Sequence, residues 1–125
     1  MPEYQVKHVL ASQCQLGEAP MWSVKDQALV WVDIERSKIH RFTPASNEHR
    51  VWDFPSRPGC FAFCEDGSAV VAARDGFYNM SFASGAIKKL HDAPFNTTTH
   101  RFNDGKPDRH GRLIAGSFLD DYLTS

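Results

Sequence analysis

The sequence repeats a pattern of strand and turn with a period of about 40 residues. Three polar turn tips, Asp26-Gln27, Asp66-Gly67 and His110-Gly111, follow one another at intervals of 40 and 44 residues, and each is followed by an apolar segment. Two further turn segments, residues 42–47 and 80–85, lie 38 residues apart. A constant period of this length is typical of architectures in which one structural unit recurs along the chain.

The segments between the turns are predicted to be β-strands. Each is short, rich in β-branched or aromatic residues, and bounded by turn-forming residues. No stretch of ten residues shows the apolar periodicity of a helix. The apolar content of 42%, with 12% aromatic residues, is sufficient for a packed core. We therefore expect an all-β protein with strands at residues 28–33, 38–42, 49–54, 69–73, 76–80 and 112–116.

A unit of four strands that recurs every 40 residues predicts a blade of a β-propeller. A β-sandwich would also explain the strands, but it would not explain the period. The innermost strand of each blade is expected about eight residues before the turn tip, at residues 17–22, 59–63 and 101–106. Because innermost strands line the central channel, Glu18, Arg101 and Asn103 are predicted to converge there.

The number of blades predicts that the propeller continues beyond this sequence. Propellers typically have four to eight blades, whereas 125 residues supply roughly the first two and a half to three. We expect residues 1–125 to be the N-terminal fragment of a single propeller domain that is truncated at its C-terminus. No linker divides the chain.

The charge balance argues against two classes of partner. Fourteen basic and fifteen acidic residues give a net charge of −1, so no basic excess favours nucleic acid or an anionic membrane surface. The N-terminus has no signal-peptide pattern, and no apolar run could span a membrane. We therefore expect a cytoplasmic protein without nucleic-acid or membrane partners. The sequence leaves the oligomeric state open.

Cysteines and histidines form no recognised ligand pattern. Cys60-x3-Cys64 lacks a second ligand pair at zinc spacing. The three cysteines are therefore predicted to be free, buried thiols. The histidines are scattered over strand edges and loops, and we expect most of them, including His40 and His49, at the surface.

Two segments contain the residue types of a binding site. Glu18 lies between a glycine and Ala19-Pro20 in an otherwise apolar segment. A carboxylate in a partly dry channel would bind calcium, magnesium, manganese or zinc, although a solvated loop glutamate is the simpler interpretation. Arg101 and Asn103 could hold the oxygens of a polyhydroxylated ligand, but Asp104-Gly105 is also common in an ordinary polar turn.

Four blocks resemble the gluconolactonase and regucalcin family of six-bladed β-propeller lactonases. They are residues 16–22, residues 29–34 with 39–42, residues 74–78, and residues 101–112, in the order that the family has them. The block from Arg101 to Arg112 is the most specific of the four. Ser117-Phe118, where the family tends to have Thr-Met, and Cys60 depart from the family pattern.

The resemblance implies hydrolysis of a sugar lactone to its aldonic acid by one divalent metal ion, which could be calcium, zinc, manganese or magnesium. Glu18 falls on the family's first metal ligand. Arg101 and Asn103 fall on substrate-binding positions, and Asp121 on another acidic substrate contact. The remaining metal ligands and the general base would come from blades beyond residue 125, so no catalytic residue is expected within this chain and the fragment is predicted to be inactive.

Two alternatives to a lactonase remain. The first is a non-catalytic calcium- or protein-binding β-propeller, which the same fold supports. The second is a propeller of the strictosidine-synthase type. The block from Arg101 to Lys106 matches the lactonase pattern more closely.

Overall fold

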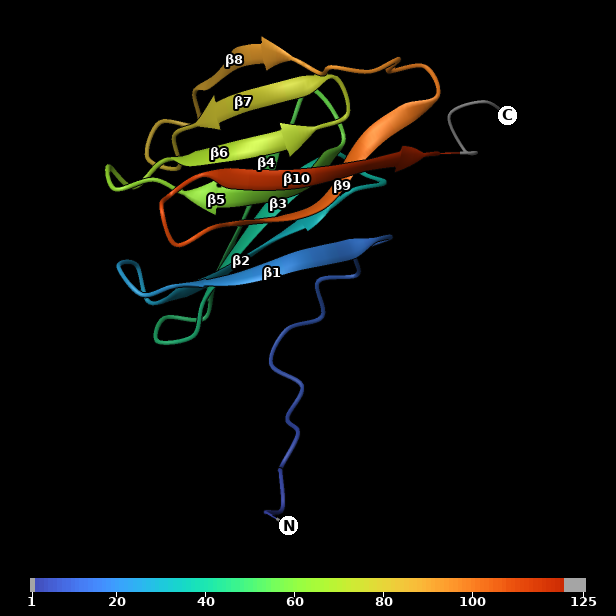
Figure 1. Ribbon diagram of the computed structural model, residues 1–125. Coiled ribbons are helices and arrows are strands. Elements are labelled where there is room, and N and C mark those ends of the chain that lie inside the picture. Colours follow the sequence, from blue (N-terminus) through green and yellow to red (C-terminus); the bar gives the residue numbers. More distant parts are fainter. Residues whose placement is uncertain (1, 121–125) are drawn as a thin grey trace.

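A computed structural model describes residues 2–120 and shows only antiparallel strands (Figure 1). Two four-stranded sheets each follow chain order, and a third sheet contains two strands. The strands are β1 (Gly17–Ser23), β2 (Ala28–Asp33), β3 (Lys38–Thr43), β4 (Glu48–Asp53), β5 (Pro58–Phe63), β6 (Ala69–Ala73), β7 (Gly76–Met80), β8 (Ile87–Asp92), β9 (His100–Pro107) and β10 (Leu113–Leu119). The all-β class and the arrangement of successive four-stranded blades are confirmed.

The predicted turn tips occupy the same place in each sheet. Each connects the first strand of its sheet to the second, and each contains a residue with positive φ: Gln27 at 51°, Gly67 at 88° and Gly111 at 78°. Glycine adopts this conformation without steric cost, whereas Gln27 must tolerate it. The sequence period therefore reflects a repeated backbone geometry.

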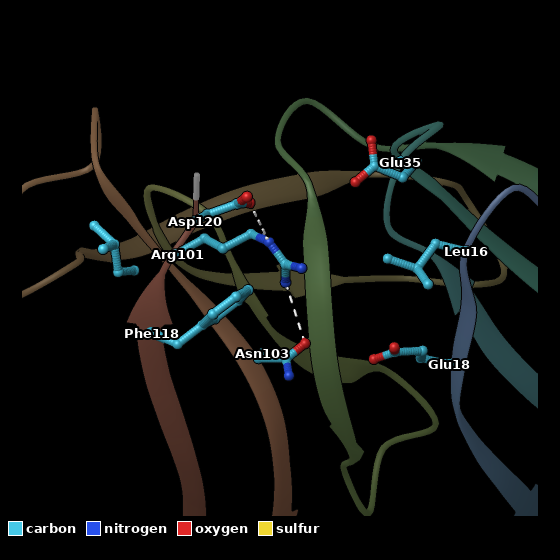
Figure 2. A pocket seen from close by; sticks show the side chains of 8 residues that line it. Leu16, Glu18, Glu35, Arg101, Asn103, Phe118 and Asp120 are labelled. Atoms are coloured by element: carbon cyan, nitrogen blue, oxygen red, sulfur yellow. Dashed lines mark hydrogen bonds and ion pairs between the residues drawn. The ribbon is translucent and has the colours of Figure 1, made fainter. Parts of the chain in front are cut away.

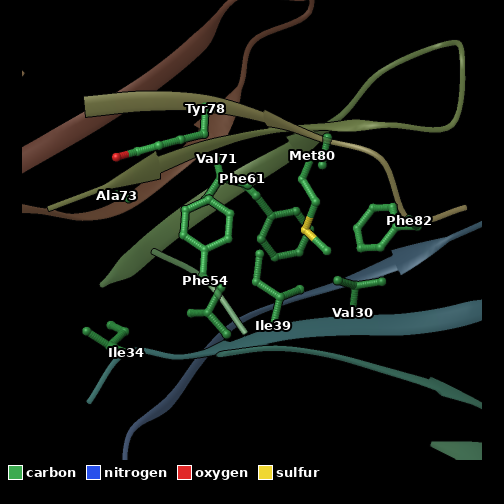
Figure 3. Close-up of a cluster of buried hydrophobic side chains, with 12 residues drawn as sticks. Val30, Ile34, Ile39, Phe54, Phe61, Val71, Ala73, Tyr78, Met80 and Phe82 are labelled. Atoms are coloured by element: carbon green, nitrogen blue, oxygen red, sulfur yellow. The ribbon is translucent and has the colours of Figure 1, made fainter. Parts of the chain in front are cut away.

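The main hydrophobic core lies between the first two sheets (Figure 3). The first sheet contributes Val30 and Ile39, and the second contributes Phe61, Val71 and Met80. All five side chains are almost completely buried. Because side chains alternate along a strand, these residues form one face of each sheet, and the two faces pack together as neighbouring blades do.

The structure contains one strand that the sequence analysis did not predict. Strand β8 lies at the outer edge of the second sheet, and most of its side chains are exposed. Its sequence Ile-Lys-Lys-Leu-His-Asp gives neither alternation nor an apolar run, so a sequence pattern that depends on burial cannot find it. No helix that could cross a membrane occurs in residues 2–120.

The first strands of the three sheets lie next to one another, and β5 packs against both β1 and β9. A glycine allows the closest of these approaches. A Cβ atom at Gly59 would lie 2.6 Å from the backbone oxygens of both Phe102 and Asn103. The absence of a side chain at Gly59 therefore brings the strand that contains Arg101 and Asn103 against β5.

Cys60 is expected to be the least reactive of the three thiols. It is completely buried between β5 and β9, and burial together with the nearby Asp104 charge raises its pKa to about 12. The thiolate is the reactive form, so iodoacetamide should modify half-buried Cys64 while Cys60 stays intact until the protein is denatured. Mass spectrometry of the native and denatured protein checks this. Equal labelling of both thiols in the native state would contradict it.

Candidate functional site

A pocket of about 310 Å³ lies where the first and third sheets face each other (Figure 2). Glu18 lies on one side, on β1, while Arg101 and Asn103 lie on the other, on β9. The predicted convergence of these three residues is thus observed. The pocket is lined by Leu16, Glu18, Glu35, Arg101, Asn103, Phe118, Leu119 and Asp120.

Glu18 precedes an irregularity in β1. It pairs with Val32, after which the register shifts before Met21, and Ala19 has a φ of 53°. Such a bulge bends a strand and redirects its side chains. The Glu18 side chain is half-buried, and no hydrogen bond or ion pair joins it to another residue within 2–120. It is a carboxylate in a pocket without a cationic partner from the described chain.

Arg101 is held rigidly in the pocket wall. It is 5% exposed, and its Nε donates to Asp120 Oδ2 over 2.7 Å. Its Nη1 donates to the Phe102 carbonyl oxygen over 3.1 Å and to Asn103 Oδ1 over 3.2 Å. The Phe118 ring lies against the guanidinium, 4.5 Å from its carbon to the ring centroid. These contacts leave the side chain little freedom and fix the direction of the N–H donors on Nη2.

A second arginine also approaches Asp120. Arg57, in the segment before β5, places Nη1 4.0 Å from Asp120 Oδ2 and Nη2 3.6 Å from Glu35 Oε2. Asp120 is 1% exposed, and its Oδ2 is the oxygen that approaches both guanidinium groups. Of the three acidic side chains in the pocket, Glu35 and Asp120 are therefore paired with arginine, whereas Glu18 is not paired with any residue within 2–120.

The amide of Asn103 has a defined orientation. Its oxygen accepts the bond from Arg101, so its two N–H donors remain for a bound oxygen. Asn103 and Glu18 also line an adjoining hollow of about 450 Å³, together with Lys106. The β9 side of the channel thus presents donors, and the β1 side presents a carboxylate. This division suits a ligand rich in oxygen atoms.

Sequence analysis did not predict the partners of Arg101. Phe118 lies opposite Arg101 in the register of β9 and β10, and Asp120 follows two residues later. The adjacent Asp121, which was predicted to contact substrate, lies outside the described residues. The only sequence signal for Asp120 is that it is a carboxylate directly after β10, the strand that pairs with β9. This signal identifies Asp120 as a partner of Arg101 only when the register of the two strands is known.

The cysteine prediction is confirmed for Cys60, which is a free, buried thiol packed between β5 and β9. Cys14 and Cys64 are free as well, but they are only half-buried. His40, which was expected at the surface, is 4% exposed. Trp31 and His49 stack beside it and exclude water from its ring.

Comparisons with known proteins agree with this fold and with the resemblance in sequence. The chain is 36% identical over 112 residues to 6-deoxy-6-sulfogluconolactonase of Pseudomonas putida, covering 90% of this chain and 38% of that protein. It is 30% identical over 122 residues to a pentonolactonase of Haloferax volcanii, covering 93% of this chain and 39% of that protein. The chain therefore spans less than two fifths of the length of these relatives.

A solved structure shares the arrangement of strands. The crystal structure of regucalcin from Agrobacterium tumefaciens, described as a calcium-binding protein, matches with a TM-score of 0.81 at 23% identity, covering 86% of this chain and 37% of that protein. The likeness shows that these strands form part of the same fold. The family model described as the SMP-30/Gluconolactonase/LRE-like region matches residues 16–124, and the chain belongs to that family.

Proposed function

We propose that the protein to which this chain belongs hydrolyses a sugar lactone to the corresponding aldonic acid in the channel between β1 and β9. The observation that carries the proposal is the Glu18 carboxylate, half-buried without a partner within residues 2–120, opposite the donors of Arg101 and Asn103. Both relatives described above are at least 30% identical and are lactonases by name, which supports the same reaction class.

A divalent cation fits the Glu18 side of the pocket. A half-buried carboxylate is costly without a positive charge nearby, and oxygen donors suit calcium, magnesium, manganese or zinc. Glu18 would hold this ion together with ligands from elsewhere in the protein, because one carboxylate does not make a tight site. The ion, when bound, supplies Lewis acidity toward the lactone carbonyl.

The β9 side of the pocket would position the sugar. Arg101 would donate charge-assisted hydrogen bonds to substrate oxygens from a guanidinium already oriented by Asp120. Asn103 would add its amide N–H groups, and Asp121 remains a predicted further contact. No residue within 2–120 is assigned as the general base, so we expect residues 1–125 alone to be inactive.

Glu18→Gln is expected to lower the affinity for divalent metal by at least 10- to 100-fold, because the substitution keeps the shape and removes the charge of a ligand. Titration calorimetry of the whole protein with calcium, manganese and zinc measures the effect. Glu48→Gln, at an exposed position on β4, is the matched control and should change nothing. If Glu18→Gln binds all three metals with unchanged affinity, Glu18 is not a metal ligand and is a solvated glutamate instead.

Lactone hydrolysis followed by pH-stat tests the proposed reaction. The whole protein should release acid from aldonolactones in the presence of metal and lose this activity in excess chelator. The alternative, a calcium- or protein-binding propeller without catalysis, is supported by the calcium-binding description of the regucalcin structure. Metal binding that depends on Glu18 without turnover of any lactone would favour that alternative.

A further inference from the structure

Three side chains that can bind metal meet on the face of the first sheet opposite to the main core. They are Cys14, in the segment before β1, Asp33 at the end of β2, and His40 in β3. One ligand atom from each lies within 4.8 Å of the other two. Asp33 and His40 are buried, and Cys14 is half-buried. None of the three belongs to the pocket that contains Arg101 and Asn103.

The spacing of these atoms suits a tetrahedral site. With zinc–sulfur and zinc–nitrogen bonds of about 2.3 and 2.0 Å, two ligands at a tetrahedral angle lie about 3.5 Å apart. The observed distance from Cys14 Sγ to His40 Nε2 is 3.6 Å. The Asp33 carboxylate lies within 4.8 Å of both other ligand atoms, so it must move by at most about 1.3 Å to complete a third edge of similar length.

Each ligand is oriented by a neighbour in the way that bound ligands are. The indole N–H of Trp31 donates to Cys14 Sγ over 3.3 Å, and His40 Nδ1 lies 2.8 Å from His49 Nε2. A hydrogen bond at Nδ1 fixes the ring so that Nε2 faces the other two ligands. Asp33 accepts backbone N–H bonds from Gln15 at 3.0 Å and Leu16 at 3.1 Å, which hold the segment around Cys14 in place.

The cluster can be approached from the side of Cys14. Cys14 lines a hollow of about 250 Å³ together with Trp31 and Glu18, whereas Asp33 and His40 lie behind it. An ion can reach the Cys14 sulfur through this hollow. A sulfur, a nitrogen and an oxygen donor together favour zinc over calcium or magnesium, which prefer oxygen ligands alone.

We propose that Cys14, Asp33 and His40 form a zinc-binding site, separate from the Glu18 site, that fastens the segment before β1 to the first sheet. The Cys14 thiol gives up its proton to solvent when zinc binds, and the thiolate takes the position that the thiol occupies beside Trp31. Because Glu18 lies only four residues after Cys14, zinc also fixes the start of the strand that contains Glu18.

Cobalt substitution of the whole protein tests the proposal. One equivalent of Co²⁺ should produce the near-ultraviolet absorption of a cobalt–thiolate bond and the visible bands of tetrahedral cobalt, and Zn²⁺ should displace it. Cys14→Ser should abolish the thiolate absorption, and it should weaken zinc binding at least tenfold. His49→Gln, which removes the imidazole that contacts His40 Nδ1 and stacks on Trp31, should weaken zinc binding by about 10-fold.

Two control variants separate this site from other thiols and from the channel. Cys64→Ser and Glu18→Gln should both retain the cobalt–thiolate absorption at full intensity. Absence of the absorption in the unmodified protein, or its persistence in Cys14→Ser, would overturn the proposal. Loss of the absorption in Glu18→Gln would also overturn it, because the two sites would then be one.

Discussion

Arg101→Ala is expected to lower the free energy of unfolding by about 3–5 kcal/mol, the usual cost of removing one member of a buried ion pair. The variant loses the 2.7 Å bond to a carboxylate that is almost completely buried, together with the contact with Phe118. Denaturant unfolding of the whole protein measures the change. Arg109→Ala, at an exposed position, is the control and should stay within about 0.5 kcal/mol of the unmodified protein.

The same variant separates two roles of Arg101. If Arg101 binds substrate, Arg101→Ala should lower kcat/KM by about 10- to 150-fold at temperatures well below its unfolding transition, the equivalent of about 1.5–3 kcal/mol. Asp120→Asn also breaks the ion pair but keeps the guanidinium. Its loss of kcat/KM should therefore be smaller than that of Arg101→Ala. Equal losses of activity in both variants would show that Arg101 acts through the structure alone.

Phe61→Ala should destabilise the protein by about 3–5 kcal/mol, because it leaves a cavity at the centre of the contact between the first two sheets. Phe61 is 1% exposed and lies among the side chains that join the sheets (Figure 3). Thermal and denaturant unfolding measure the loss. Phe61→Leu, which fills most of the volume, should cost less than half as much. A loss below about 1 kcal/mol for Phe61→Ala would show that the sheets do not depend on this contact.

The strands and turns could be predicted from sequence because their causes are local. The positive φ at Gly67 and Gly111 lies at dipeptides that are typical of turns, and apolar alternation marks strands that are buried on a face. Strand β8 was missed because an edge strand needs no apolar side chains. It forms through backbone hydrogen bonds to β7, which leave no pattern in the sequence.

The site could be predicted only in part for a similar reason. Glu18, Arg101 and Asn103 could be placed in one channel from the repeat alone. The ion pair of Arg101 with Asp120 depends on the register between β9 and β10, which includes a shift after Ala115. The buried state of His40 depends on the stacking of Trp31 and His49 across three strands. A one-residue change in any register would undo these contacts, and bulges such as the one after Ala115 prevent the registers from being counted along the sequence.

Because each sheet consists of consecutive hairpins, the first sheet can form before the third during biosynthesis. All strands of the first sheet pair with their neighbours in sequence, so this sheet can form while β9 is still inside the ribosome. Glu18 is then already placed in its bulged strand, whereas β9, which forms the opposite side of the pocket, is translated later as part of the third sheet. All three tryptophans lie in the first sheet, so their fluorescence follows the formation of this sheet and, through Trp52, its packing against the second sheet.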